Sequence, residues 1–127
     1  MVAALDTNVA VGFLRGIKDI EKKVLNFDAI YLPVIVCGEL LFGAVNATKK
    51  EENLIKTRKF INNCKILSIN YLISEQYANI RADLKSIGKP IPENDIWIAA
   101  VCSINNIPLF SHDKHFKNIN KSFLKLV

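Results

Sequence analysis

The sequence predicts a three-layer α/β/α domain with a mostly parallel sheet of about five strands. Short apolar runs of strand character alternate with longer segments whose apolar side chains recur at helical spacing, which is typical of βαβ units. Right-handed crossovers then place helices on both faces of the sheet. Half of the 127 residues are hydrophobic and 23% are charged, so we expect one globular domain over residues 1–127, not a disordered chain.

The strands are expected where short apolar runs meet turn-forming or helix-starting residues. They cover residues 1–5, 29–32, 66–69, 107–110 and, as a fifth strand, 123–127. The first run ends abruptly at Asp6, and helical patterning follows until Gly16. This arrangement is typical of a buried strand that delivers a carboxylate to the carboxyl edge of a sheet, where ligands bind in open α/β folds.

Helices are expected between these strands. The helical segments are 9–16, 17–27, 34–47, 48–64, 73–87 and 96–104. Thr48 and Glu51 have the spacing of a capping box, and Asn94 or Asp95 should open the last helix. The helix over 34–47 is apolar nearly all round, which predicts a central, covered helix.

Net charge and cysteine content limit the class of partner and the cellular compartment that we expect. Seventeen Lys and Arg against twelve Asp and Glu give a net charge of +5, which favours a polyanionic partner without identifying one. Cys37, Cys64 and Cys102 form no C-x-x-C pair, so they are interpreted as reduced core thiols of a cytoplasmic protein. No apolar stretch is long enough to span a bilayer and the first run lacks a basic leader, so we expect a soluble protein with no membrane partner.

Four acids are candidates for a functional site. Asp6, Asp95 and Asp113 each have an ordinary alternative role, because aspartate is a favoured helix-capping and turn residue. Glu39 stands in the middle of an apolar helix, with no basic residue within one helical turn. A buried carboxylate there needs an ion pair from elsewhere in the fold, a proton or a bound cation.

Taken together, the acids predict a metal site. Asp6 and Asp113 both follow strands, and the carboxyl ends of parallel strands meet at one edge of the sheet. Asp95 and the region around Glu39 open helices that should enter the core from that edge. Four neighbouring carboxylates repel one another, and a hard divalent cation such as Mg²⁺ or Mn²⁺ relieves this repulsion.

Four segments resemble the motifs of PIN-domain ribonucleases, in particular the VapC-type toxins of toxin–antitoxin pairs. They are residues 5–8 (LDTN), 39–43 (ELLFG), 92–100 (PENDIWIAA) and 110–116 (FSHDKHF). The resemblance covers essentially the whole chain. Each motif alone is weak, but the four in this order, in a chain of this length, form a fairly specific set. The resemblance implies a PIN-like fold and a metal-dependent endoribonuclease. The family more often has glycine and a small apolar residue where this chain has Pro92, Glu93 and Asn94.

The resemblance also implies roles and partners. Asp6, Glu39, Asp95 and Asp113 would form the acidic Mg²⁺ or Mn²⁺ site and catalyse RNA hydrolysis. The expected partners are an RNA substrate, with tRNA as one candidate, a cognate VapB-type antitoxin, and a second copy in a homodimer. Asn8 and Ser111 would orient carboxylates or water.

Two other functions compete with this one. The main alternative is a catalytically silent PIN-like module that binds RNA or protein. A haloacid-dehalogenase-like phosphatase is disfavoured because position 8 is asparagine where that class needs an aspartate.

The remaining candidates have equally good structural explanations. Lys114 and Lys117 follow the last acid in a carboxyl-terminal region without further acids, so they are candidates to contact RNA phosphates or simply to be solvated. His112 and His115 are interpreted as residues of a solvent-facing turn. Three aromatic residues stand at helical core spacing, which favours packing over base stacking: Phe42, Tyr77 and Trp97. Arg81 lies off the apolar stripe of its helix, where a surface ion pair is as good an interpretation as an RNA or dimer contact.

Overall fold

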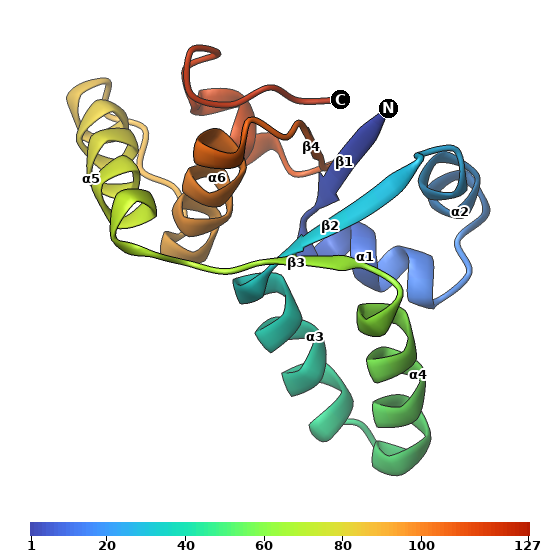
Figure 1. Cartoon of the computed structure of the whole chain (residues 1–127). Helices are drawn as coiled ribbons and strands as arrows, with labels where there is room; N and C mark the ends of the chain where they lie inside the picture. The colour runs from blue at the N-terminus through green and yellow to red at the C-terminus, as the bar shows by residue number, and fades with distance from the viewer.

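A parallel sheet of four strands forms the centre of the computed structural model, which describes residues 1–127 (Figure 1). Its strands lie in the order β3-β2-β1-β4, with bounds β1 (Val2–Leu5), β2 (Ala29–Pro33), β3 (Lys65–Leu67) and β4 (Leu109–Phe110). Every neighbouring pair is parallel, so the predicted α/β class is confirmed. The predicted fifth strand reduces to one bridge between Leu109 and Leu126, because β4 offers only two residues to pair with.

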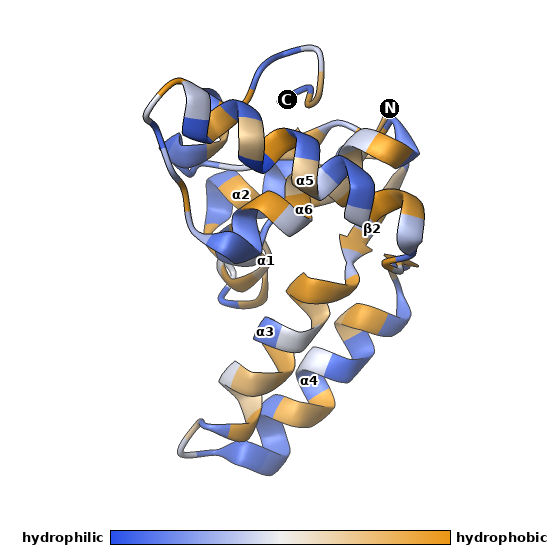
Figure 2. Ribbon diagram, turned by 90° about the vertical axis from the view of Figure 1, so that its left-hand side faces the viewer, coloured by the Kyte–Doolittle hydropathy of each residue, from blue (hydrophilic) through white to orange (hydrophobic).

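Helices cover both faces of this sheet. Their bounds are α1 (Thr7–Leu14), α2 (Lys18–Leu25), α3 (Val34–Val45), α4 (Lys50–Asn62), α5 (Tyr71–Ser86) and α6 (Glu93–Asn105), followed by the 3₁₀ helix η1 (Lys114–Asn118). Figure 1 shows α5 and α6 on one side of the strands and α1 and α2 on the other. The α3–α4 pair projects beyond the sheet, as Figure 2 also shows. No helix is both long and apolar enough to cross a membrane.

The core lies around β1. Ala3, Ala4 and Leu5 are fully buried, as expected for a central parallel strand with helices on both faces. Ile98 to Cys102 of α6 are buried as well, so this helix is as central as its sequence predicts. The three cysteines are free thiols; Cys37 and Cys102 lie in the core as predicted, whereas Cys64 is only half-buried.

The prediction that α3 is a covered helix is wrong on one side. Val36, Cys37, Leu40 and Ala44 are buried, but Phe42 is 69% exposed. The reason is the position of α3, which extends past the sheet and leaves one side without a neighbouring element (Figure 2). The sequence shows how apolar a helix is, but which of its sides are buried depends on the elements that pack against it in the fold.

Two helix starts depart from the sequence interpretation. Thr48 does not cap α4, which begins at Lys50 after a turn and has no side-chain cap. Neither Asn94 nor Asp95 caps α6, because that helix begins at Glu93 with Pro92 at the N-cap. Asp95 therefore lies in the first turn of α6, and its side chain does not cap the helix.

Candidate functional site at the carboxyl edge of the sheet

Asp6 lies at the end of β1 and is only 3% exposed. Its Oδ1 accepts a hydrogen bond of 3.0 Å from the backbone N–H of Val9, so it does cap α1, and its Oδ2 accepts one from the hydroxyl of Ser111. Burial raises the pKa of Asp6 and the charge of Asp113 adds to this rise, while the two hydrogen bonds oppose it. The capping role alone does not account for a carboxylate buried beside another acid.

Asp113 is brought to Asp6 by the strand register. Leu5 pairs with Phe110, so the residues that follow β1 and β4 lie at the same edge. The hydroxyl of Ser111 donates to Asp6 and accepts a 2.9 Å hydrogen bond from the backbone N–H of Asp113. Oδ1 of Asp113 accepts from the backbone N–H of His115, which caps η1.

Asp95 approaches the same point from the first turn of α6. Its Oδ2 lies 3.4 Å from Nδ1 of His115, and that nitrogen lies 3.1 Å from Oδ1 of Asp113. Burial is the largest cause of the raised pKa of Asp95, followed by the charge of Asp113. Ligand atoms of Asp95, Asp113 and His115 all lie within 4.8 Å of one another.

His115 is a site residue that sequence analysis underrated. The sequence predicts a solvent-facing turn for it, and it is exposed, but its Nδ1 faces two carboxylates. The signal that points to it is its position two residues after Asp113. A capping aspartate followed by one 3₁₀ turn holds the two side chains together.

Glu39 lies to one side of this cluster. Its Oε1 accepts a 2.8 Å hydrogen bond from the hydroxyl of Thr7, the neighbour of Asp6. The expectation of a buried carboxylate is wrong, since Glu39 is half-buried and forms no ion pair. The structure thus gathers Asp6, Asp95 and Asp113 and connects Glu39 to them through Thr7.

The supporting residues divide into those that contact the acids and those that do not. Ser111 contacts both Asp6 and Asp113, whereas Asn8 is exposed and its side chain makes no hydrogen bond to them. Lys114 and Lys117 are exposed and form no ion pair within 4.0 Å.

Glu93, the unusual acid near Asp95, is turned toward α5. Its Oε1 accepts a 2.7 Å hydrogen bond from the hydroxyl of Tyr77 and lies 3.9 Å from Arg81. Arg81 therefore forms a surface ion pair, and the Tyr77 ring stacks on Trp97 with centroids 4.0 Å apart. These contacts give Glu93 protein partners outside the acidic cluster.

The donor chemistry fits a hard divalent cation. Three carboxylates converge, and two of them have raised pKa values because burial and neighbouring negative charge disfavour their ionised form. A cation between them would reverse that cost, and oxygen ligands suit Mg²⁺ or Mn²⁺. His115 is the basic side chain that lies within 4.0 Å of both Asp95 and Asp113.

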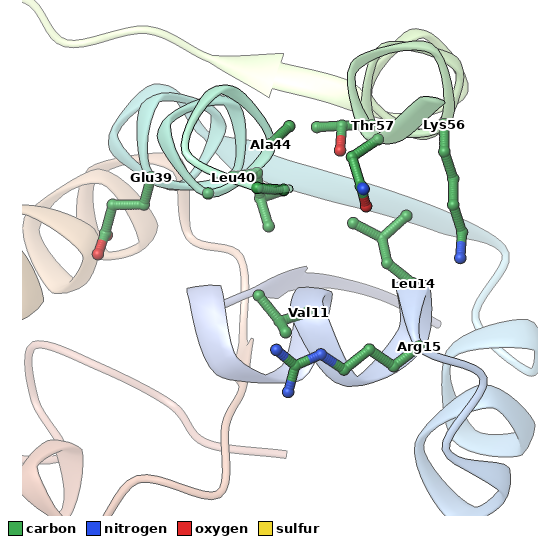
Figure 3. A pocket seen from close by; sticks show the side chains of 11 residues that line it. Val11, Leu14, Arg15, Glu39, Leu40, Ala44, Lys56 and Thr57 are labelled. Carbon is green, nitrogen blue, oxygen red and sulfur yellow. The ribbon is translucent and has the colours of Figure 1, made fainter. Parts of the chain in front are cut away.

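A cleft of about 220 Å³ runs between α1, α3 and α4 (Figure 3). Its floor is apolar and includes Val11, Leu14 and Leu40, while Arg15 and Lys56 border it. Glu39 lies at one end of the cleft (Figure 3), which therefore leads to the acidic residues.

The parallel sheet and the acids at its carboxyl edge define an α/β domain with an acidic site. The model of the PIN domain family matches residues 3–122, so the chain belongs to the PIN-domain family. The resemblance drawn from the four sequence motifs is thereby confirmed.

Known proteins align over almost the full chain. Ribonuclease VapC2 of Rickettsia felis is 28% identical over 130 residues, covering 98% of this chain and 97% of the relative. The crystal structure of VapBC2 from Rickettsia felis bound to a DNA fragment from their promoter superimposes with a TM-score of 0.89 at 27% identity, covering 100% of this chain and 98% of that chain. VapBC-1 from nontypeable Haemophilus influenzae gives a TM-score of 0.87 at 26% identity, with coverage of 100% and 97%.

Proposed function

We propose that this protein is a metal-dependent endoribonuclease that hydrolyses RNA phosphodiester bonds and acts as the toxin of a toxin–antitoxin pair. The observation that carries the proposal is the convergence of Asp6 and Asp95 on Asp113: burial raises the pKa values of Asp6 and Asp95, and the charge of Asp113 raises both further. Relatives that share the full length of the chain are named Ribonuclease VapC, which supports the same chemistry here.

In this proposal Asp6, Asp95 and Asp113 hold Mg²⁺ or Mn²⁺. Such an ion supplies an acidified water and offsets charge on the leaving oxygen of a phosphodiester. Ser111 and the N–H of Val9 fix the carboxylate of Asp6 in one orientation. Glu39 uses one oxygen to accept from Thr7 and keeps the other free of protein donors, so we assign it the role of proton acceptor.

The substrate reaches the acids along a basic approach. Lys114 and Lys117 stand directly after Asp113 and are exposed without ion pairs, so they are available to phosphates. Asn8 is also exposed at the start of α1, where it would orient water rather than a carboxylate. RNA, with tRNA as one candidate, is the proposed substrate.

The proposed partner is a VapB-type antitoxin. Structures similar to this chain are VapBC complexes. The cleft between α1, α3 and α4 has an apolar floor bordered by Arg15 and Lys56, which suits an apolar segment carrying acidic residues. We also propose that the toxin is a homodimer. Analytical ultracentrifugation of the purified chain tests this through its molecular mass in solution.

The test is cleavage of total tRNA and of a single-stranded RNA by the purified chain, with Mg²⁺ or Mn²⁺ and with a chelator. We expect cleavage to require the ion. In Asp6→Asn the cleavage rate should fall at least a hundredfold, which corresponds to a barrier higher by roughly 3 kcal/mol. Asp19→Asn, an exposed acid at the start of α2, is the matched control. If the chain is a silent RNA- or protein-binding module, the wild-type protein will cleave no more RNA than Asp6→Asn does. That outcome refutes the enzymatic proposal.

A further inference from the structure

A shallow, open depression lies beside the acidic site, between α3 and the start of α6. Its lining includes Thr7, Glu39 and Asn94, together with Gly38 and Phe42. Thr7 follows Asp6 and Asn94 precedes Asp95, so two of the site's carboxylates belong to residues next to those that line the depression. Anything seated there is held directly beside the acids.

Phe42 is the aromatic ring available in this depression. The other two aromatic candidates, Tyr77 and Trp97, are occupied by stacking on each other, whereas Phe42 is 69% exposed. Long side chains on a helix lean toward its N-terminus, so the ring of Phe42 leans over the preceding turn, which contains Gly38. A Cβ at Gly38 would meet no atom within 4 Å, so the space next to the ring is open.

The lining of the depression matches the two kinds of surface on a nucleobase. A base has a flat π face, which stacks on an aromatic ring, and a polar edge, which hydrogen-bonds to hydroxyl and amide groups such as those of Thr7 and Asn94. A second copy of the chain or an apolar peptide seated in this depression would also bury the hydroxyl of Thr7 and the amide of Asn94, and an apolar surface offers these groups no hydrogen-bond partner.

We propose that Phe42 stacks on an unpaired nucleobase of single-stranded RNA and so positions the neighbouring phosphodiester beside the acids. This inference rests on the proposed ribonuclease function and adds a residue that positions its substrate. Bases within a duplex are already stacked on their neighbours, so the depression selects single-stranded segments.

The experiment measures RNA affinity in the Asp6→Asn background, which keeps the RNA intact during titration. Three probes of equal length are compared: a single-stranded oligoadenylate, an abasic ribose-phosphate strand, and an RNA duplex. Phe42→Ala should weaken oligoadenylate binding about tenfold and leave binding of the abasic strand and the duplex unchanged. Phe42→Trp should retain the affinity, because it keeps an aromatic face.

Two further variants separate stacking from general effects. Gly38→Leu adds a side chain to the depression at a position where a Cβ meets no atom within 4 Å. It also replaces a mid-helix glycine by a better helix former, so it should fold at least as well and still lose oligoadenylate affinity. Ile55→Ala removes an exposed side chain of similar exposure (68%) from α4 and should leave the affinity unchanged.

Equal losses on the oligoadenylate and the abasic strand would overturn the proposal, because a phosphate contact does not need a base. A Phe42→Ala variant that changes only the sedimentation of the protein would assign this ring to contacts between copies and also overturn it. If the wild-type chain cleaves RNA and Phe42→Ala binds it normally, the inference fails and the ribonuclease function stands. If the wild-type chain neither cleaves nor binds any of the probes, the ribonuclease function fails with it.

Discussion

The hydroxyl of Ser111 donates a hydrogen bond to Oδ2 of Asp6 across 105 residues of sequence. The same hydroxyl accepts from the backbone N–H of Asp113. One small side chain therefore fixes the positions of two acids that follow different strands. The bond to Asp6 also opposes the rise in the pKa of this carboxyl caused by burial.

Replacing Ser111 by Ala should weaken metal binding. The substitution removes the only side-chain donor to Asp6, so its pKa rises further and its ionised form becomes harder to reach. Loss of a group that orients a metal ligand typically costs about 10–100-fold in affinity, and we expect a loss in that range for Mn²⁺ measured by calorimetry. Ser122→Ala, an exposed serine outside the site, is the control. Equal affinities of the two variants would show that the hydroxyl does not support the ion.

Asp6→Asn should stabilise the metal-free protein near neutral pH. Asparagine keeps one oxygen to accept from the N–H of Val9, and it is as good an N-cap as aspartate. Its amide N–H₂ replaces Oδ2, so the hydrogen bond with the Ser111 hydroxyl is kept with the direction reversed and the amide donating. What it removes is the buried charge, the largest cause of the raised pKa. We expect its melting temperature in a chelator to exceed that of the wild type by a few degrees, and Mn²⁺ to raise the wild-type value only.

The pH dependence of this difference has a definite sign. A carboxyl whose folded-state pKa is raised binds its proton more tightly in the folded than in the unfolded chain, so the free energy of unfolding falls as pH rises from its ordinary value of 3.8 to the raised value. The stability advantage of Asp6→Asn should therefore shrink as pH falls through this window. An advantage that stays constant down to pH 3.8 would contradict the assignment to Asp6.

Much of this architecture follows from local pattern. The apolar run that ends at Asp6 and the helix that starts immediately after it are readable because both depend on neighbouring residues. Gly16 ends α1 as predicted, with a positive φ of 73°. The meeting of Asp6 and Asp113 also follows from a parallel sheet, since both acids stand just after a strand.

Other features depend on contacts that periodicity does not encode. The exposure of Phe42 depends on how far α3 extends past the sheet, and the half-burial of Glu39 depends on how α3 lies beside the start of α1, where Thr7 donates to its carboxylate. His115 was underrated because its role comes from one 3₁₀ turn packed against α6. The partners of Glu93 lie on α5, the helix before α6. The sequence therefore shows the extra negative charge of Glu93 but not the side chains that it contacts.

Glu93→Gln should leave the acidic site unchanged. Glu93 is held by the hydroxyl of Tyr77 and lies near Arg81, so its charge is directed away from Asp95. We expect the same number of bound Mn²⁺ ions and the same affinity in calorimetry as for the wild type. Asp95→Asn is the contrasting variant, because its carboxylate belongs to the cluster with Asp113, and its affinity should drop sharply. A matching drop in Glu93→Gln would make Glu93 a ligand.

Lys114→Ala combined with Lys117→Ala should reduce the salt dependence of RNA binding. Each lysine that neutralises a phosphate of single-stranded RNA contributes about 0.7 to the slope of the logarithm of the binding constant against the logarithm of salt concentration. Losing both contacts should therefore lower the magnitude of the slope by about 1.4, with little change in preference among sequences. Lys18→Ala combined with Lys22→Ala removes the same charge from exposed positions on α2 and serves as the control. The measurement is a titration of oligoadenylate at several salt concentrations in the Asp6→Asn background. If both double variants keep the wild-type slope, the lysines after Asp113 are solvated side chains and the RNA backbone takes another path to the acids.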